Sequence, residues 1–126
     1  MRVFAVLDCR SLRHCPPALQ HLAIRSFMEQ HGGEISYYTC EDPLTLPYGV
    51  LKSELVVMKA DALCFFTTKQ FVHGEFDLPF LEELLASPVG GSVGFAREGV
   101  IITPATYGAM RPWLWREGLN DAIPLL

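Results

Sequence analysis

Short apolar runs alternate along the chain with segments in which apolar residues recur every three or four positions. The runs at residues 2–8, 35–39 and 62–67 are rich in branched and aromatic side chains and carry no helical stripe, which is typical of buried strands. Residues 93–96 and 100–102 are two further strand segments by the same criteria. The pattern therefore predicts a sheet of four or five strands.

Segments with helical spacing lie between these runs. A Pro-Pro pair at residues 16–17 suits the first turn of a helix, which the glycine pair at 32–33 ends. The positions that recur at helical spacing in it are Leu19, Leu22, Ala23, Ser26 and Phe27. A second helix is predicted at residues 47–59 and a third at 77–87.

The stretch after Thr103 is richer in residues that interrupt helices. These are Pro104, Gly108 and Pro112, and they are accompanied by Trp113 and Trp115. From about residue 104 we therefore expect a less regular segment with a short helix, which docks on the body of the protein or on a neighbouring copy.

Strands that are apolar on both faces and alternate with amphipathic helices are typical of a parallel sheet covered on both sides. We therefore expect residues 1–126 to form a single α/β domain of three layers. Its sheet should be mainly parallel, in the flavodoxin-like or resolvase-like order 2-1-3-4, with the first strand in a central position.

Composition predicts association as well as a core. Of the 126 residues, 50% are hydrophobic and only 19% are charged, so few charged side chains are left to cover the surface. We expect some apolar surface to be shared with another subunit in a homo-oligomer. Trp113 or Trp115 would be covered at that interface, and the alternative is that both dock within their own chain.

Charge and cysteine usage exclude several classes of partner. The net charge of −4 provides no cationic field for phosphate backbones, so we expect no nucleic-acid partner. The first apolar run, at residues 3–7, is too short for a signal peptide or a membrane span, so we expect a cytoplasmic protein with no membrane partner.

The cysteines stand far apart, which is typical of reduced thiols and predicts no metal site. They are Cys9, Cys15, Cys40 and Cys64.

Polar residues follow each predicted strand. In an open parallel sheet, ligands bind beyond the carboxyl ends of the strands, so we expect a site there. Its candidate catalytic residues are Glu41 and Glu98. Its candidate binding residues are Arg10, Ser11, Tyr48, Thr67, Thr68 and Gln70. The alternative is that these are the polar loops that every α/β domain has at its strand ends.

The guanidinium of Arg10 offers a fixed fork for a carboxylate or a phosphate, or else it pairs with Glu41 or Asp42. Either Glu41 or Glu98 becomes a general acid or base if the crevice partly desolvates it, and otherwise remains a solvated loop carboxylate. The hydroxyl of Tyr48 either points into the crevice or bonds to the backbone while its ring packs.

A nucleophilic thiol is a minor hypothesis. Cys9 stands beside Arg10, and His14 or His73 would be its base, although a small buried cysteine is the more common case. The sequence has no motif for a dinucleotide-binding fold, a phosphate-binding loop, a hydrolase nucleophile elbow or a zinc protease. If the protein is an enzyme, we therefore expect it to act without a cofactor.

Two resemblances bear on function. In its order of a short strand, a polar turn at residues 8–11 and a long helix, the chain resembles the catalytic domain of serine recombinases. That resemblance implies fold only, because residues 67–70 lack the Asp-Arg pair of that family and strand exchange is not expected.

The chain from residue 2 to about 102 is more similar to the sporadic carbohydrate cluster proteins, which are small proteins of bacterial gene clusters for surface carbohydrates. The similarity rests on residues 19–29, on Glu41 followed by Pro47-Tyr48, and on residues 94–100. It implies cytoplasmic work on activated sugars or their lipid-linked products. The residues it singles out are Arg10, Glu41, Tyr48 and Glu98.

Two functions are compatible with these observations. One is a cofactor-independent protein of carbohydrate biosynthesis that binds or converts a small anionic sugar-derived metabolite at the carboxyl ends of the strands. The other is a non-catalytic oligomeric partner or regulator of a carbohydrate-biosynthesis enzyme. A ligand screen distinguishes them, because only the first predicts stabilisation by a sugar phosphate or a nucleotide sugar.

Overall fold

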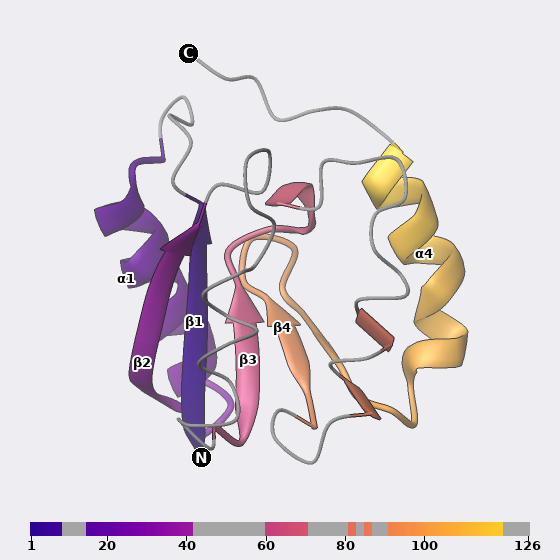
Figure 1. The fold of residues 1–126 in the computed structure, drawn as a ribbon, viewed down its shortest axis with the longest axis horizontal. Coiled ribbons are helices and arrows are strands. Elements are labelled where there is room, and N and C mark those ends of the chain that lie inside the picture. The colour runs from indigo at the N-terminus through magenta and orange to yellow at the C-terminus, as the bar shows by residue number, and fades with distance from the viewer. Residues whose placement is uncertain (9–14, 42–59, 71–80, 83–84, 87–90, 120–126) are drawn as a thin grey trace.

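The structure, a computed structural model, describes residues 1–8, 15–41, 60–70, 81–82, 85–86 and 91–119 (Figure 1). Its elements are, in chain order, β1 (Arg2–Asp8), α1 (Pro17–Glu29), β2 (Glu34–Glu41), β3 (Ala62–Phe65), the 3-10 turn η1 (Thr68–Gln70), β4 (Val93–Phe95), β5 (Val100–Ile102) and α4 (Tyr107–Leu119). Residues 81–82 and 85–86 also have helical backbone.

The five strands form one sheet in the order β2-β1-β3-β4-β5. β1 pairs in parallel with β2 and β3, and β3 pairs in parallel with β4. β5 is antiparallel because it follows β4 directly through a tight turn at residues 96–99. The prediction of an α/β protein with a mainly parallel sheet of four or five strands is confirmed.

Both faces of β1 are buried. Val3 and Ala5 pack in one core cluster with Ile24 of α1, whereas Phe4 packs in a second cluster with Leu114 of α4. Because successive residues of a strand point to opposite faces, these two clusters lie on opposite sides of the sheet. Figure 1 shows α1 beside β2 and α4 beyond β4. The apolar character of every residue from 3 to 7 follows from this double burial.

Close packing of α1 on the sheet depends on a glycine in β4. A Cβ atom at Gly94 would lie 3.3 Å from Sγ of Cys64 and 3.3 Å from Cε2 of Phe27. Both distances are shorter than a side-chain carbon usually tolerates, so the absence of a side chain lets α1 approach β4 across β3.

The buried face of α1 differs from the predicted one. It consists of Gln20, Ile24 and Met28, spaced four residues apart. The leucines misled the prediction because a polar residue, Gln20, occupies a core position, where its amide bonds to the backbone of Asp8. The predicted positions that are instead exposed are Leu19, Leu22 and Ser26.

The segment after Thr103 is more regular than predicted, since α4 is a helix of 13 residues. Reciprocal hydrogen bonds join Thr103 and Thr106: Thr103 N donates to Oγ1 of Thr106 over 2.9 Å, and Thr106 N donates to Oγ1 of Thr103 over 3.3 Å. This arrangement resembles a capping box, and Pro104 suits the position that follows such a cap. The threonine pair was the overlooked signal for a helix start.

Trp113 is half-buried and packs against the core of its own chain, together with Tyr107 and Met110 of α4. For this residue the structure has the intramolecular packing that was the alternative to a subunit interface. The side chain of Trp115 lies outside the described residues, as do the predicted helix at 47–59 and both ends of the helix predicted at 77–87. None of the helices seen in the described parts of the chain is long and apolar enough to cross a membrane.

The corrected face of α1 generates a matched pair of variants. Ile24→Ala should lower the free energy of unfolding by about 2–5 kcal/mol, because Ile24 is fully buried. Leu22→Ala should change it by about 0.5 kcal/mol or less, because Leu22 is 54% exposed. Urea unfolding followed by circular dichroism measures both. Equal losses of unfolding free energy in the two variants would show that Leu22 is buried as the sequence predicted.

Candidate functional site

The buried polar side chains of the described residues gather at one edge of the sheet. They are Asp8, Gln20, Thr39, Thr67, Thr68 and Gln70. Asp8 ends β1, Thr39 lies near the end of β2, and the residues from 67 to 70 follow β3. Because strands β1 to β4 are parallel, these ends meet at one edge, which is the carboxyl edge where the sequence predicts a site.

Gln20 extends the hydrogen bonding of β1 from the first turn of α1. Its Oε1 accepts from Asp8 N over 2.8 Å, and its Nε2 donates to the carbonyl of Asp8 over 3.2 Å and to that of Cys15 over 3.1 Å. A side-chain amide can satisfy a donor and an acceptor at once, so Gln20 bonds to both backbone groups of Asp8 as a neighbouring strand would. Sequence reasoning missed this residue because glutamine on a helix normally faces solvent.

Gln70 does the same from the other side. Its Nε2 donates to the carbonyl of Val6 over 3.1 Å, and its Oε1 accepts from Thr67 N over 3.0 Å. Gln70 was predicted to bind ligand. In this structure its amide is engaged with backbone groups, so it holds η1 against the end of β1.

Glu98 stands in the turn between β4 and β5. Its Oε2 accepts from Oγ1 of Thr67 over 2.7 Å and from Oγ1 of Thr68 over 3.3 Å, while its Oε1 accepts from Thr68 N over 3.2 Å. Gly99 makes this turn possible, with a φ of +69° and an N–H that donates to the carbonyl of Phe95 over 2.9 Å. Three donors thus fix the carboxylate against the end of β3.

The structure therefore brings together four of the predicted site residues, which are Thr67, Thr68, Gln70 and Glu98. It also places the backbone of Glu41 opposite Asp8 in the pairing of β2 with β1. Asp8, which is fully buried, was not assigned a role from the sequence, although a buried acid at a strand end is an unusual residue.

Several predicted residues lie outside the described parts of the chain. They are Arg10, Ser11 and Tyr48 of the candidate binding set, and Cys9, His14 and His73 of the thiol hypothesis. The side chain of Glu41 is outside them as well. Among the residues that the structure does describe, no three of the types His, Cys, Asp and Glu converge on a point where a metal ion would sit.

The described cysteines are free thiols in three different environments. Cys64 is buried, Cys15 is half-buried and Cys40 is exposed. Burial raises the pKa of the Cys64 thiol to about 12, and it also raises the pKa of Cys15, against the opposing charge of Arg97. Neither thiol is activated as a nucleophile.

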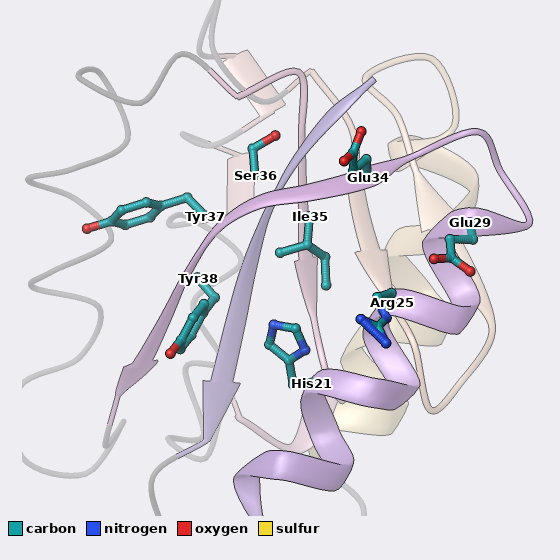
Figure 2. Close-up of a pocket in the computed structure, with 8 residues that line it drawn as sticks. All are labelled: His21, Arg25, Glu29, Glu34, Ile35, Ser36, Tyr37 and Tyr38. Carbon is teal, nitrogen blue, oxygen red and sulfur yellow. The ribbon is translucent and has the colours of Figure 1, made fainter.

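A hollow that the sequence did not predict lies between α1 and β2 and has a volume of about 680 Å³. Figure 2 shows His21 pointing from α1 toward Ile35 of β2, with Tyr38 standing beside His21 and Arg25 on the next turn of α1. The rings of His21 and Tyr38 are 5.2 Å apart at 87° to each other. The shape of the hollow depends on the pairing of β2 with β1, which cannot be read from the sequence.

Comparison of this chain with known protein families, with curated proteins and with solved structures found no match. The residues at the carboxyl edge are therefore interpreted from their geometry and chemistry.

The contacts of Glu98 predict its effect on stability. Glu98→Ala should lower the free energy of unfolding by about 1–3 kcal/mol, because the buried hydroxyl of Thr67 loses its acceptor. Glu82→Ala is the control, since the hydrogen bond from Tyr107 to Glu82 is exposed, and should cost about 1 kcal/mol or less. Chemical unfolding measures both. Equal costs would show that the bonds of Glu98 do not stabilise the carboxyl edge.

The burial of Cys64 predicts a dependence on pH. Because its pKa is about 12 in the folded protein and 9.0 in the unfolded chain, the folded thiol keeps its proton between these values while the unfolded thiol loses it. Relative to Cys64→Ala, the free energy of unfolding should be constant below pH 9.0 and should fall above it by up to about 1.4 kcal/mol per pH unit. Cys40→Ala, which retains Cys64, should follow the wild type. Parallel curves for wild type and Cys64→Ala would contradict this assignment.

Proposed function

We propose that the carboxyl edge of the sheet binds, and in an enzyme converts, a small anionic sugar-derived metabolite. The observation that carries the proposal is that all the buried polar side chains of the described residues lie along this edge. Burying polar groups costs free energy, so a structure concentrates them where a fixed polar arrangement has a use.

Three side chains support the proposal because they fix the segments of this edge to one another. They are the amides of Gln20 and Gln70 and the carboxylate of Glu98. They join the end of β1 to α1, η1 to β1, and the turn after β4 to the end of β3. Loops that bind a ligand lose little entropy on binding when their ends are fixed in this way.

The two predicted carboxylates receive different roles. Glu98 already accepts three hydrogen bonds out of about four acceptor directions, so we assign it as a positioning residue. Glu41 is then the candidate for proton transfer, and Arg10 is the candidate for holding the phosphate or carboxylate of the ligand.

The nature of the ligand rests on the resemblance to the sporadic carbohydrate cluster proteins. In this proposal the protein works in the cytoplasm on activated sugars. Its strands follow the flavodoxin-like or resolvase-like order in a domain of three layers, which leaves a crevice at the ends of β1 and β3.

One observation favours the alternative, a non-catalytic oligomeric partner or regulator. Leu19 and Leu22 of α1 and Tyr38 of β2 are about half exposed, at 49%, 54% and 57%. Apolar side chains exposed on neighbouring elements are typical of surfaces that a partner covers. Light scattering shows whether that partner is a second copy of the chain. The protein concentration should be on the order of tens of micromolar, at which oligomers of ordinary affinity assemble.

A thermal-shift screen with sugar phosphates and nucleotide sugars tests the proposal. A ligand at about a hundred times its dissociation constant should stabilise the protein by about 2.7 kcal/mol, which corresponds to a shift of several degrees. Arg10→Ala should weaken binding of that ligand by about 1.5–3 kcal/mol and leave the unliganded melting temperature nearly unchanged.

Arg111→Ala is the matched control, because Arg111 is an exposed arginine of α4 whose side chain lies 4.0 Å from that of Glu82. It should bind ligand like the wild type. No shift with any compound of the panel, or an unchanged affinity in Arg10→Ala, would exclude the binding function and leave the oligomeric alternative.

A further inference from the structure

The hollow between α1 and β2 originates in a bulge of the edge strand. Val3 of β1 pairs with Ile35 and Phe4 pairs with Tyr37, so that Ser36 is an extra residue without a partner in β1. Such a bulge reverses which side chains face each side of the sheet, and bulges are frequent beside functional sites.

The consequence is visible in the packing of β2. Ile35 packs in the cluster of α1, whereas Tyr37 packs on the opposite face, where its ring lies 4.9 Å from that of Phe4. The next side chain on the α1 side is Tyr38, which contacts His21. A regular strand would present a side chain to α1 at every second position. Here the step from Ile35 to Tyr38 is three positions, with Ser36 and Tyr37 between them, and the longer step leaves a gap.

Three charged side chains line this gap. Among the residues that the structure describes, the side chains of Arg25, Glu29 and Glu34 make neither a hydrogen bond nor an ion pair. Figure 2 shows Tyr38 and His21 at one end of the hollow, Arg25 in the middle and Glu29 at the other end, while the side chain of Glu34 points from β2 away from α1. The two rings meet nearly at a right angle, which leaves a corner for a flat group.

We propose that this hollow binds a small zwitterion that carries a planar ring, of which a free aromatic amino acid is the simplest example. The ring occupies the corner of His21 and Tyr38 over Ile35. The carboxylate of the ligand pairs with the guanidinium of Arg25, and its ammonium group lies toward Glu29. The volume of about 680 Å³ is within the usual range for small-molecule sites.

The charge balance selects this class over nucleotides. The charged side chains that line the hollow, one arginine and two glutamates, have a formal net charge of about −1. A phosphate with two negative charges would meet this net charge unfavourably, whereas a zwitterion finds a counterion for each of its groups. This site is separate from the one at the carboxyl edge, and it does not depend on the proposed sugar ligand.

The probe is L-tryptophan, followed by changes in the backbone amide signals of 15N-labelled full-length protein. The signals of residues 34–38 should shift, with a dissociation constant on the order of 1 mM or below. Tryptamine, which lacks the carboxylate, and indole-3-propionate, which lacks the ammonium group, should each bind about tenfold more weakly or worse. These two compounds also distinguish a free amino acid from the end of a peptide chain.

Arg25→Gln completes the test. It should weaken L-tryptophan by about tenfold or more while leaving tryptamine unaffected, because only the carboxylate pairs with Arg25. Arg111→Gln on α4 and Arg10→Ala should both bind L-tryptophan like the wild type, which separates this proposal from the one at the carboxyl edge. Both arginine variants at positions 25 and 111 replace an exposed side chain, so the fold is retained.

Three results would overturn the proposal. The first is the absence of shifts at residues 34–38 up to about 10 mM L-tryptophan, well above any useful affinity. The second is a loss of selectivity, seen either as equal affinity of Arg25→Gln for L-tryptophan or as binding of adenosine monophosphate at the same residues as tightly as L-tryptophan. The third is a dependence of these signals on protein concentration without ligand, which would show that a second copy of the chain occupies the hollow.

Discussion

The end of β1 has no access to water, and the arrangement of the carboxyl edge follows from that constraint. Every residue from Val3 to Asp8 is buried, so the last peptide groups of the strand must find partners within the protein. Two glutamine amides, from α1 and from η1, supply partners for Asp8 and Val6. The positions of the first helix and of the segment after β3 are therefore tied to one strand end by directional bonds and not by apolar packing alone.

The same bonds make this edge a rigid platform. Glu98 links the turn after β4 to the residues that follow β3, and its acceptors are satisfied by two threonine side chains and one backbone amide. An arrangement in which polar groups hold one another in place has few ways to rearrange, which is the property that a site for a polar ligand requires. Function at this edge would then reside in the loops that the platform supports.

The sequence predicted the strands because double burial removes polar residues from them. It also predicted that Thr67, Thr68, Gln70 and Glu98 lie together, because a parallel sheet gathers its strand ends. It did not predict that Gln20 belongs to the buried face of α1, because Gln20 satisfies backbone groups that only the folded chain presents. It did not predict the bulge at Ser36 either, since the register of β2 is set by its pairing with β1. Local composition records burial, whereas directional bonds and register depend on a partner elsewhere in the chain.

Gly94 links the packing of α1 on the sheet to the turn that carries Glu98. A Cβ atom at this position would meet Cys64 and Phe27, and Gly94 stands four residues before Glu98 on the short path from β4 into the turn. Any side chain at this position would push the helix and the strand apart, and the displacement would be carried into the turn that holds the carboxylate. Natural variation at position 94 should therefore be accompanied by compensating changes in α1, so that helix and turn evolve as a single unit.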